Sequence, residues 1–182
     1  MFQMGRKYTN RRRKRNKTEV YTSVRSSSNA GTIDISAYRF EITRESVERL
    51  ESFQKELSGE LCGIILGSTI GERTYRINFI SEICNKSSSN KTGCERDAKK
   101  ANEIIGREYE KSSHTRVYMG EWHAHPENFP RPSIVDLNSV SKIYFTDELV
   151  IDGVLLCIVG LRKIYWGFYS KGNLFDISPE LI

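Results

Sequence analysis

The sequence lacks any apolar run long enough to cross a membrane, and it has no hydrophobic segment behind its basic N-terminus. A membrane-spanning helix needs roughly 18 or more consecutive apolar residues, and no window of this chain approaches that length. A secretory signal needs an apolar stretch after its positive charges, which this N-terminus also lacks. We therefore expect a cytoplasmic protein that makes no membrane contact.

Cysteine is scarce, and no two of the four cysteines form a C-x-x-C pair. Cys62 and Cys157 lie inside strongly apolar runs, where a reduced thiol behaves as a small hydrophobic side chain. We expect both to be buried and unpaired. Cys84 and Cys94 flank a polar loop and could come together, but the sequence leaves their pairing open. The four cysteines are not spaced to provide a structural zinc site.

Positive charge is concentrated at the N-terminus. The whole chain has a net charge of +5, yet the first 25 residues contain nine Lys or Arg and one acidic residue, so the rest of the chain is acidic. The basic N-terminal segment has too few apolar residues to bury enough apolar surface to fold. We predict a basic, disordered arm over residues 1–30 and one globular domain over residues 31–182. The arm is either a nonspecific nucleic-acid contact or a solvated tail without a partner.

Hydrophobic periodicity predicts an α/β domain. Helices are expected over residues 44–57 and 95–111 and from Ser133 onward. Strands are expected over residues 38–42, 61–66, 74–80, 116–125, 153–160 and 163–170. This order lacks the regular alternation of strand and helix that a doubly wound sheet requires. We therefore predict a mixed central β-sheet flanked by helices.

His123 and His125 are separated by one residue at the end of a predicted strand, so both side chains project from the same face. Asp136 lies in the first turn of the following helix, where the helix dipole tolerates a carboxylate that can turn back to the strand end. Two imidazole nitrogens and one carboxylate oxygen leave the fourth tetrahedral position open, as in a catalytic zinc site. The alternative is a pair of hydrogen-bonded strand histidines without a metal.

Hydrolysis of an amide at such a zinc site also needs a base. Glu60 precedes the apolar, glycine-bracketed run "LCGIILG", where a partly desolvated carboxylate would be suited to proton transfer. The alternative for Glu60 is a solvated charge at the entry of a strand. Ser133 could donate to the oxyanion of a tetrahedral intermediate or cap the helix at the amide of Asp136, which is the more common role of an S-x-x-D pattern.

The pattern H-x-H-P, six residues, and S-x-x-D, with a distant glutamate before a glycine-rich strand, resembles the JAMM metalloproteases, also called the MPN or JAB family. This chain fits the pattern without a gap from His123 to Asp136. The resemblance implies a cytidine-deaminase-like α/β fold and a zinc isopeptidase or peptidase with one zinc ion per chain. By it, His123, His125 and Asp136 are metal ligands, Glu60 is the catalytic base, and Ser133 is the oxyanion donor.

The segments "YMGEWHAHPE" and "ERDAKKANEII" are similar to bacterial JAB proteins of CBASS anti-phage operons. That resemblance implies hydrolysis of the amide bond at the C-terminus of a conjugated ubiquitin-like protein or cGAS-like nucleotidyltransferase. We expect the extended C-terminal tail of this substrate to pair with a sheet edge beside the site. The long basic arm departs from the group, as does Cys62, at a position that more often holds a small residue.

Two alternatives to this function remain at the level of the sequence. One is a JAB peptidase of a biosynthetic operon that acts on small peptide conjugates. The other is a non-catalytic MPN scaffold that binds protein partners. Such scaffolds typically lack metal ligands, whereas this chain retains the whole set, which favours an enzyme.

Overall fold

The computed structural model describes residues 33–55, 57, 59–84 and 94–182. The basic arm predicted over residues 1–30 and the polar loop predicted over residues 85–93 lie outside the described residues. No helix in the described part of the chain has the length and the apolar character of a membrane span.

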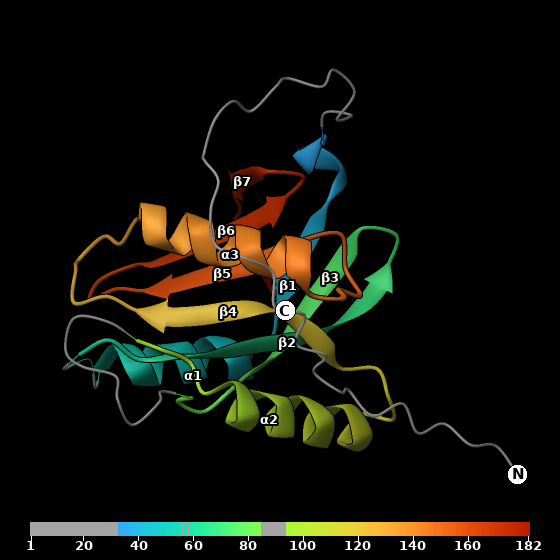
Figure 1. Cartoon of the computed structure of the whole chain (residues 1–182), viewed down its shortest axis with the longest axis horizontal. Helices are drawn as coiled ribbons and strands as arrows, with labels where there is room; N and C mark the ends of the chain where they lie inside the picture. Colours follow the sequence, from blue (N-terminus) through green and yellow to red (C-terminus); the bar gives the residue numbers. More distant parts are fainter. Residues whose placement is uncertain (1–32, 56, 58, 85–93) are drawn as a thin grey trace, which may run out of the picture. The chain divides into compact units, whose positions relative to one another are not determined.

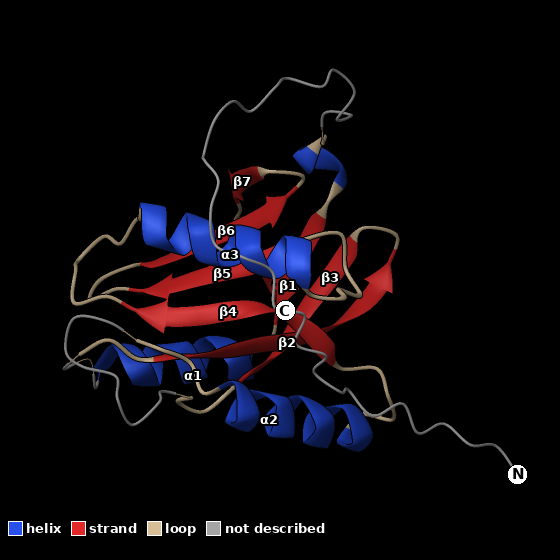
Figure 2. Ribbon diagram, viewed as in Figure 1, coloured by secondary structure: helices blue, strands red, loops and turns tan. Residues whose placement is uncertain are grey.

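The described part of the chain is built around a mixed sheet of eight strands (Figures 1 and 2). The strands are β1 (Arg39–Ile42), β2 (Cys62–Gly71), β3 (Thr74–Ile80), β4 (Val117–Ala124), β5 (Val154–Val159), β6 (Ile164–Ser170), β7 (Asn173–Asp176) and β8 (Glu180–Leu181). Their order in the sheet is β7-β6-β5-β4-β2-β3-β1-β8. Strand β4 pairs parallel with β5 and antiparallel with β2, so both of its edges are occupied.

The predicted mixed α/β architecture is confirmed, and the differences concern short elements. The predicted strands and helices are all present, with ends that differ by a few residues. Three further elements precede or follow them: β7, β8 and a 3-10 turn, η1 (Ile35–Ala37). Each has two to four residues and is largely exposed. Sequences this short carry too little hydrophobic periodicity to be recognised before the fold is known.

Helix α1 (Arg44–Lys55) covers one face of the sheet. Its Leu50 and Phe53 are buried in a core that includes Ile65 of β2 and Trp122 of β4. The rings of Phe53 and Trp122 stack with their centroids 4.3 Å apart. Side chains alternate between the faces of a strand, so the residues of β4 on either side of Trp122 must point to the opposite face.

Helices α2 (Ala98–Lys111) and α3 (Ile134–Thr146) cover that opposite face. Helix α2 packs beside β2 through Ala101 and Ile104, and α3 packs on β5 through Val140 and Ile143 (Figure 1). Strand β5 therefore has helices on both faces, which is why its sequence "VLLCIV" is a continuous apolar run rather than an alternating one. The interval between α2 and α3 lies over β4, and the candidate site lies there.

Candidate functional site

Strand β4 carries both histidines to this face of the sheet. His123 is the last residue but one of the strand, and Ala124 between the histidines is fully buried on the other side. The backbone N–H of His125 donates to the carbonyl of Val159, which continues the pairing with β5 beyond the end of the strand. The two imidazole rings lie with their centroids 4.7 Å apart. The expected placement of both histidines on one face is confirmed.

Asp136, in the first turn of α3, completes a group of three possible metal ligands. One ligand atom from each of His123, His125 and Asp136 lies within 4.8 Å of the other two. Oδ1 of Asp136 is 3.2 Å from Nε2 of His123. This contact is not a hydrogen bond, and among the residues that the structure describes the buried Nε2 of His123 has no hydrogen-bond partner. A buried ring nitrogen without a partner costs free energy, and a bound metal ion would remove this cost, so the three residues fit a metal site.

Ser133 determines how the carboxylate of Asp136 is oriented. The backbone N–H and the hydroxyl of Ser133 both donate to Oδ2 of Asp136, each at 2.7 Å. The amide of Asp136 donates in return to the Ser133 hydroxyl, which completes a capping box at the start of α3. Burial raises the pKa of Asp136, but the contact with His123 and the hydrogen bonds from Ser133 outweigh burial and hold this pKa well below its usual value. The carboxylate is therefore charged at neutral pH.

The proline-rich loop between β4 and α3 is held against the turn between β5 and β6. The carbonyl of Asn128 accepts hydrogen bonds from the backbone N–H groups of Arg162 and Lys163. The carbonyl of Glu127 accepts one from the backbone N–H of Leu161. A Cβ on Gly160 would overlap the ring of Pro130, so a residue without a side chain allows the loop to approach. Because these contacts hold the loop in place, α3 begins close to the end of β4.

Glu60 reaches the same site from the segment that leads into β2. The carbonyl of Leu61 accepts a hydrogen bond from the amide of Ala124, so the pairing of β2 with β4 extends past Cys62. Extending this register by one residue would set Glu60 opposite His125, on the same face of the sheet. Glu60 lines one groove of about 630 Å³ together with both histidines, Ser133 and Asp136. The structure thus brings together all five residues that the sequence singled out.

The groove has two walls. Helix α3 forms one wall with residues such as Val135, Ser139 and Lys142, and Cys94, Glu95 and Arg96 form the other.

Glu121 lies within this groove, two residues before His123 on the same face of β4. Its carboxylate is 2.6 Å from the guanidinium of Arg96 and accepts a hydrogen bond from the hydroxyl of Tyr118 at 3.3 Å. Burial raises the pKa of Glu121, although the charge of Arg96 opposes this.

Sequence reasoning missed Arg96 and Glu121. The two-residue spacing of Glu121 from His123 was the available signal for the glutamate, because alternate residues of a strand share a face.

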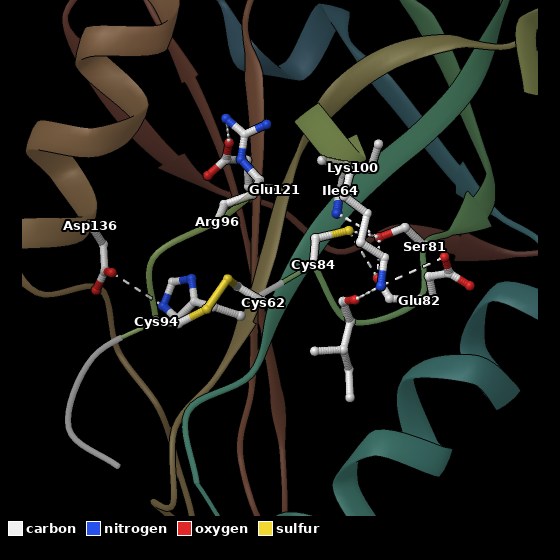
Figure 3. The surroundings of a disulfide bond; sticks show 12 residues. Cys62, Ile64, Ser81, Glu82, Cys84, Cys94, Arg96, Lys100, Glu121 and Asp136 are labelled. Atoms are coloured by element: carbon white, nitrogen blue, oxygen red, sulfur yellow. Dashed lines mark hydrogen bonds and ion pairs between the residues drawn. A yellow bond between two sulfur atoms is a disulfide. The ribbon is translucent and has the colours of Figure 1, made fainter. Parts of the chain in front are cut away.

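The prediction that Cys62 is unpaired is wrong. Cys62 is buried but forms a disulfide with Cys94, and the two Cα atoms are 6.1 Å apart (Figure 3). Cys84 and Cys157 are free and buried, so Cys157 is as predicted, and Cys94 does not pair with Cys84. An apolar run predicts that a cysteine within it is buried, but it does not predict which residue the cysteine pairs with. Cys62 pairs with Cys94 because the segment that precedes α2 passes beside the first residue of β2. That approach is a tertiary feature.

Three comparisons relate this chain to known proteins. Residues 48–166 match the family described as prokaryotic homologs of the JAB domain. A CD-NTase/cGAS isopeptidase of Escherichia coli strain TW11681 is 31% identical over 144 residues, which cover 78% of this chain and 88% of that protein. A CD-NTase/cGAS isopeptidase of Vibrio cholerae serotype O1 is 32% identical over 137 residues, covering 74% of this chain and 84% of that protein.

The solved structures agree with this at the level of the fold. The solution structure of a protein from Desulfitobacterium hafniense superimposes with a TM-score of 0.53 at 17% identity, covering 78% of this chain and 90% of that one.

Proposed function

The chain belongs to the family of prokaryotic JAB domain proteins, and we propose that it is a zinc-dependent isopeptidase of CBASS anti-phage defence. Its substrate would be a cGAS-like nucleotidyltransferase joined through its C-terminus to another molecule, in keeping with the names of its two relatives. The observation that carries the proposal is the meeting of His123, His125 and Asp136 within 4.8 Å, in one groove with Glu60.

We propose that His123, His125 and Asp136 hold one zinc ion per chain. Two imidazoles and a carboxylate are the ligand set of an open, catalytic zinc. When bound, zinc polarises the scissile carbonyl and lowers the pKa of a water molecule toward neutrality. Ser133 supports this site by binding Oδ2 of Asp136, which leaves Oδ1 toward His123.

Glu60 would serve as the base. In the hydrolysis, the oxygen of water bonds to the carbonyl carbon and the carbon–nitrogen bond breaks. Glu60 accepts a proton from the attacking water and transfers it to the leaving amine nitrogen, so the carboxylate is regenerated at the end. Ser133 would donate to the oxyanion. Its hydroxyl donates to Asp136 in this structure, so this role requires the hydroxyl to rotate toward the substrate.

The extended tail of the substrate would lie in the groove between α3 and the Cys94–Arg96 wall. The pairing with a sheet edge that the sequence suggested does not suit β2 or β4, because both strands are paired on two sides. Within the described sheet, the terminal strands are β7 and β8. Recognition would therefore depend on groove side chains, including the Arg96–Glu121 pair.

The test compares the zinc-loaded protein with Glu60→Gln and with Glu103→Gln as the matched control. Glu103 is an exposed glutamate of α2 that lies outside the residues lining the groove. The substrate is a CD-NTase/cGAS protein whose C-terminus is joined by an amide bond to a reporter domain. We expect Glu60→Gln to bind zinc normally and to cleave at least about 100-fold more slowly, while Glu103→Gln cleaves at a rate close to wild type.

Three other outcomes would contradict parts of the proposal. Zinc-bound Glu60→Gln that cleaves at the wild-type rate would remove Glu60 as the base. Cleavage of short peptide conjugates but not of the protein conjugate would favour the biosynthetic peptidase. A protein that cleaves neither would favour the scaffold.

We also propose that residues 1–30 form a separate basic arm and that residues 31–182 contain the whole catalytic domain. All the elements of the described fold lie from Ile35 onward, and the family match lies within residues 48–166. A chain that begins at Gly31 should bind one zinc ion and cleave as the full chain does. If the arm contacts nucleic acid, only the full chain should bind it, with an affinity that falls steeply as salt rises.

A further inference from the structure

The Cys62–Cys94 disulfide lies in the wall of the candidate catalytic groove. Cys62 is directly opposite His123 in the pairing of β2 with β4, so the two side chains share a face. Cys94 belongs to the wall that faces α3, and both half-cystines line the groove together with Asp136. In Figure 3, Asp136 is drawn to the left of the disulfide and the Arg96–Glu121 pair above it.

The bond anchors one end of the Cys94–Arg96 wall to the sheet. Two residues farther along, Arg96 is held by its ion pair with Glu121 at 2.6 Å. The amide of Asp97 then donates to the carbonyl of Cys84 at 2.6 Å, after which α2 begins. Breaking the disulfide would therefore remove the covalent anchor from this wall and would leave the pairing of β2 with β4 in place.

We propose that Cys62 and Cys94 form a reversible thiol–disulfide exchange site, and that the closed disulfide positions Arg96 and its neighbours to bind the substrate tail. This inference rests on the isopeptidase function proposed above. The reductant would be a dithiol that enters the groove and attacks at Cys94, since Cys62 is buried and Cys94 is partly exposed. One of its thiolates attacks one sulfur of the bond, and its second thiol resolves the mixed disulfide. The dithiol loses two electrons and two protons, and Cys62 and Cys94 become two thiols.

The two free cysteines are poorly placed to perform this exchange within the protein. The thiol of Cys84 is buried, donates to the carbonyl of Glu82 at 3.2 Å and lies 3.7 Å from the hydroxyl of Ser81. Burial also raises the pKa of the Cys84 thiol, which lowers the fraction of reactive thiolate. Cys157 is fully buried in β5. Among the described cysteines, the groove disulfide is thus the pair open to an external thiol.

Opening the bond should weaken substrate binding more than it slows the chemical step. The candidate zinc ligands lie on β4 and α3 or beside them, outside the released wall, so zinc content should not change. A wall that has lost its anchor must become ordered each time a substrate binds, and that ordering costs affinity. We expect KM to rise about five- to tenfold and kcat to stay within about twofold of its original value.

The experiment uses the full zinc-loaded chain in three forms: oxidised wild type, wild type reduced with dithiothreitol and then desalted, and Cys94→Ser. Peptide mapping without reductant should show Cys62 linked to Cys94 in the oxidised form alone. Both other forms should show the higher KM and an equally weakened binding of a fluorescent peptide from the C-terminus of the CD-NTase/cGAS substrate. Cys84→Ala is the matched control, which should keep the disulfide and respond to dithiothreitol as wild type does.

Three results would overturn the inference. In the first, Cys62 and Cys94 are recovered as thiols from the oxidised protein. In the second, Cys94→Ser binds the peptide as tightly as oxidised wild type does. In the third, reduction removes zinc, which would make the bond part of the metal site instead. An oxidised protein that binds zinc and cleaves nothing would instead contradict the isopeptidase function, and peptide mapping and peptide binding would still decide the role of the disulfide.

Discussion

Oδ1 of Asp136 lies 3.2 Å from Nε2 of His123, although the two residues belong to different elements joined by a proline-rich loop. The second oxygen of the carboxylate is bound by the backbone and the hydroxyl of Ser133. The two carboxylate oxygens of Asp136 therefore have different roles. One oxygen stabilises the start of α3, and the other faces the histidines, where a metal ion would bind.

Asp136→Asn should weaken zinc binding while leaving the fold intact. The amide side chain is uncharged and can still accept the hydrogen bonds of the capping box, but it is a poor zinc ligand. We expect the zinc affinity to fall about 100-fold or more, measured by competition with a chromophoric chelator. Asp147→Asn is the matched control, since Asp147 lines the same groove outside the group of three. Equal affinities in the two variants would exclude Asp136 as a ligand.

Ser133→Ala should destabilise the protein and weaken the metal site together. Loss of the N-cap costs about 1 kcal/mol of unfolding free energy, which corresponds to a fall in Tm of about 2–4 °C. Zinc affinity should also fall, because Oδ2 of Asp136 loses its hydroxyl donor. Ser133→Thr keeps a hydroxyl and should restore both properties.

The same variants test whether Ser133 donates to the oxyanion. If it does, kcat at saturating zinc should fall about 100-fold in Ser133→Ala. An unchanged kcat would leave Ser133 with its structural role alone.

Glu108 of α2 should stabilise the fold at neutral pH and lose this effect in acid. Its side chain is buried and is surrounded by three cations, Arg107, Lys111 and Arg116. Burial alone would raise the pKa of Glu108, but the cations outweigh burial and hold it below its usual value. The folded state therefore binds the proton less tightly than the unfolded state does, so stability is present above the unfolded pKa of about 4.3 and is lost as pH falls through the lower, folded pKa.

Glu108→Gln measures this contribution. We expect the variant to lose about 2 kcal/mol of unfolding free energy at pH 7 and the difference from wild type to shrink below about pH 4. Glu103→Gln, on the exposed face of the same helix, should change stability by less than about 0.5 kcal/mol. A difference for Glu108→Gln that stays constant down to pH 3 would show that its charge is not responsible.

Two glycine substitutions should have opposite effects. A Cβ built on Gly120 of β4 would overlap the backbone carbonyl oxygen of Leu155 on β5. Gly120→Ala should therefore cost about 3 kcal/mol or more, because neither strand can move without disturbing the sheet. Gly106 is in the interior of α2 and its Cβ position is open, so Gly106→Ala should stabilise the protein by about 0.5–1 kcal/mol. Denaturant unfolding measures the change in unfolding free energy for each variant. Changes of the same sign and size in the two variants would contradict this prediction.

The sequence by itself determined the local features of this protein. The helical spacing of apolar residues in α1, α2 and α3 follows from the requirement that each helix bury one face. The spacing of His123 and His125 was sufficient to place both on one face of β4, since alternate residues of a strand share a face. The S-x-x-D pattern likewise predicted the capping box between Ser133 and Asp136, because its partners are three residues apart. These features depend on neighbours along the chain, which the sequence displays directly.

Only the tertiary structure decided which residues that are far apart in the sequence come into contact. It placed β4 between β2 and β5, each of which is paired on both sides, and it brought Glu60 into one groove with His125. It also joined Cys62 to Cys94 and set Arg96 against Glu121. The order and register of strands depend on how distant apolar faces pack together, and a local pattern of residues is compatible with many such packings. The partner of a side chain across the sheet is therefore determined by the assembled core.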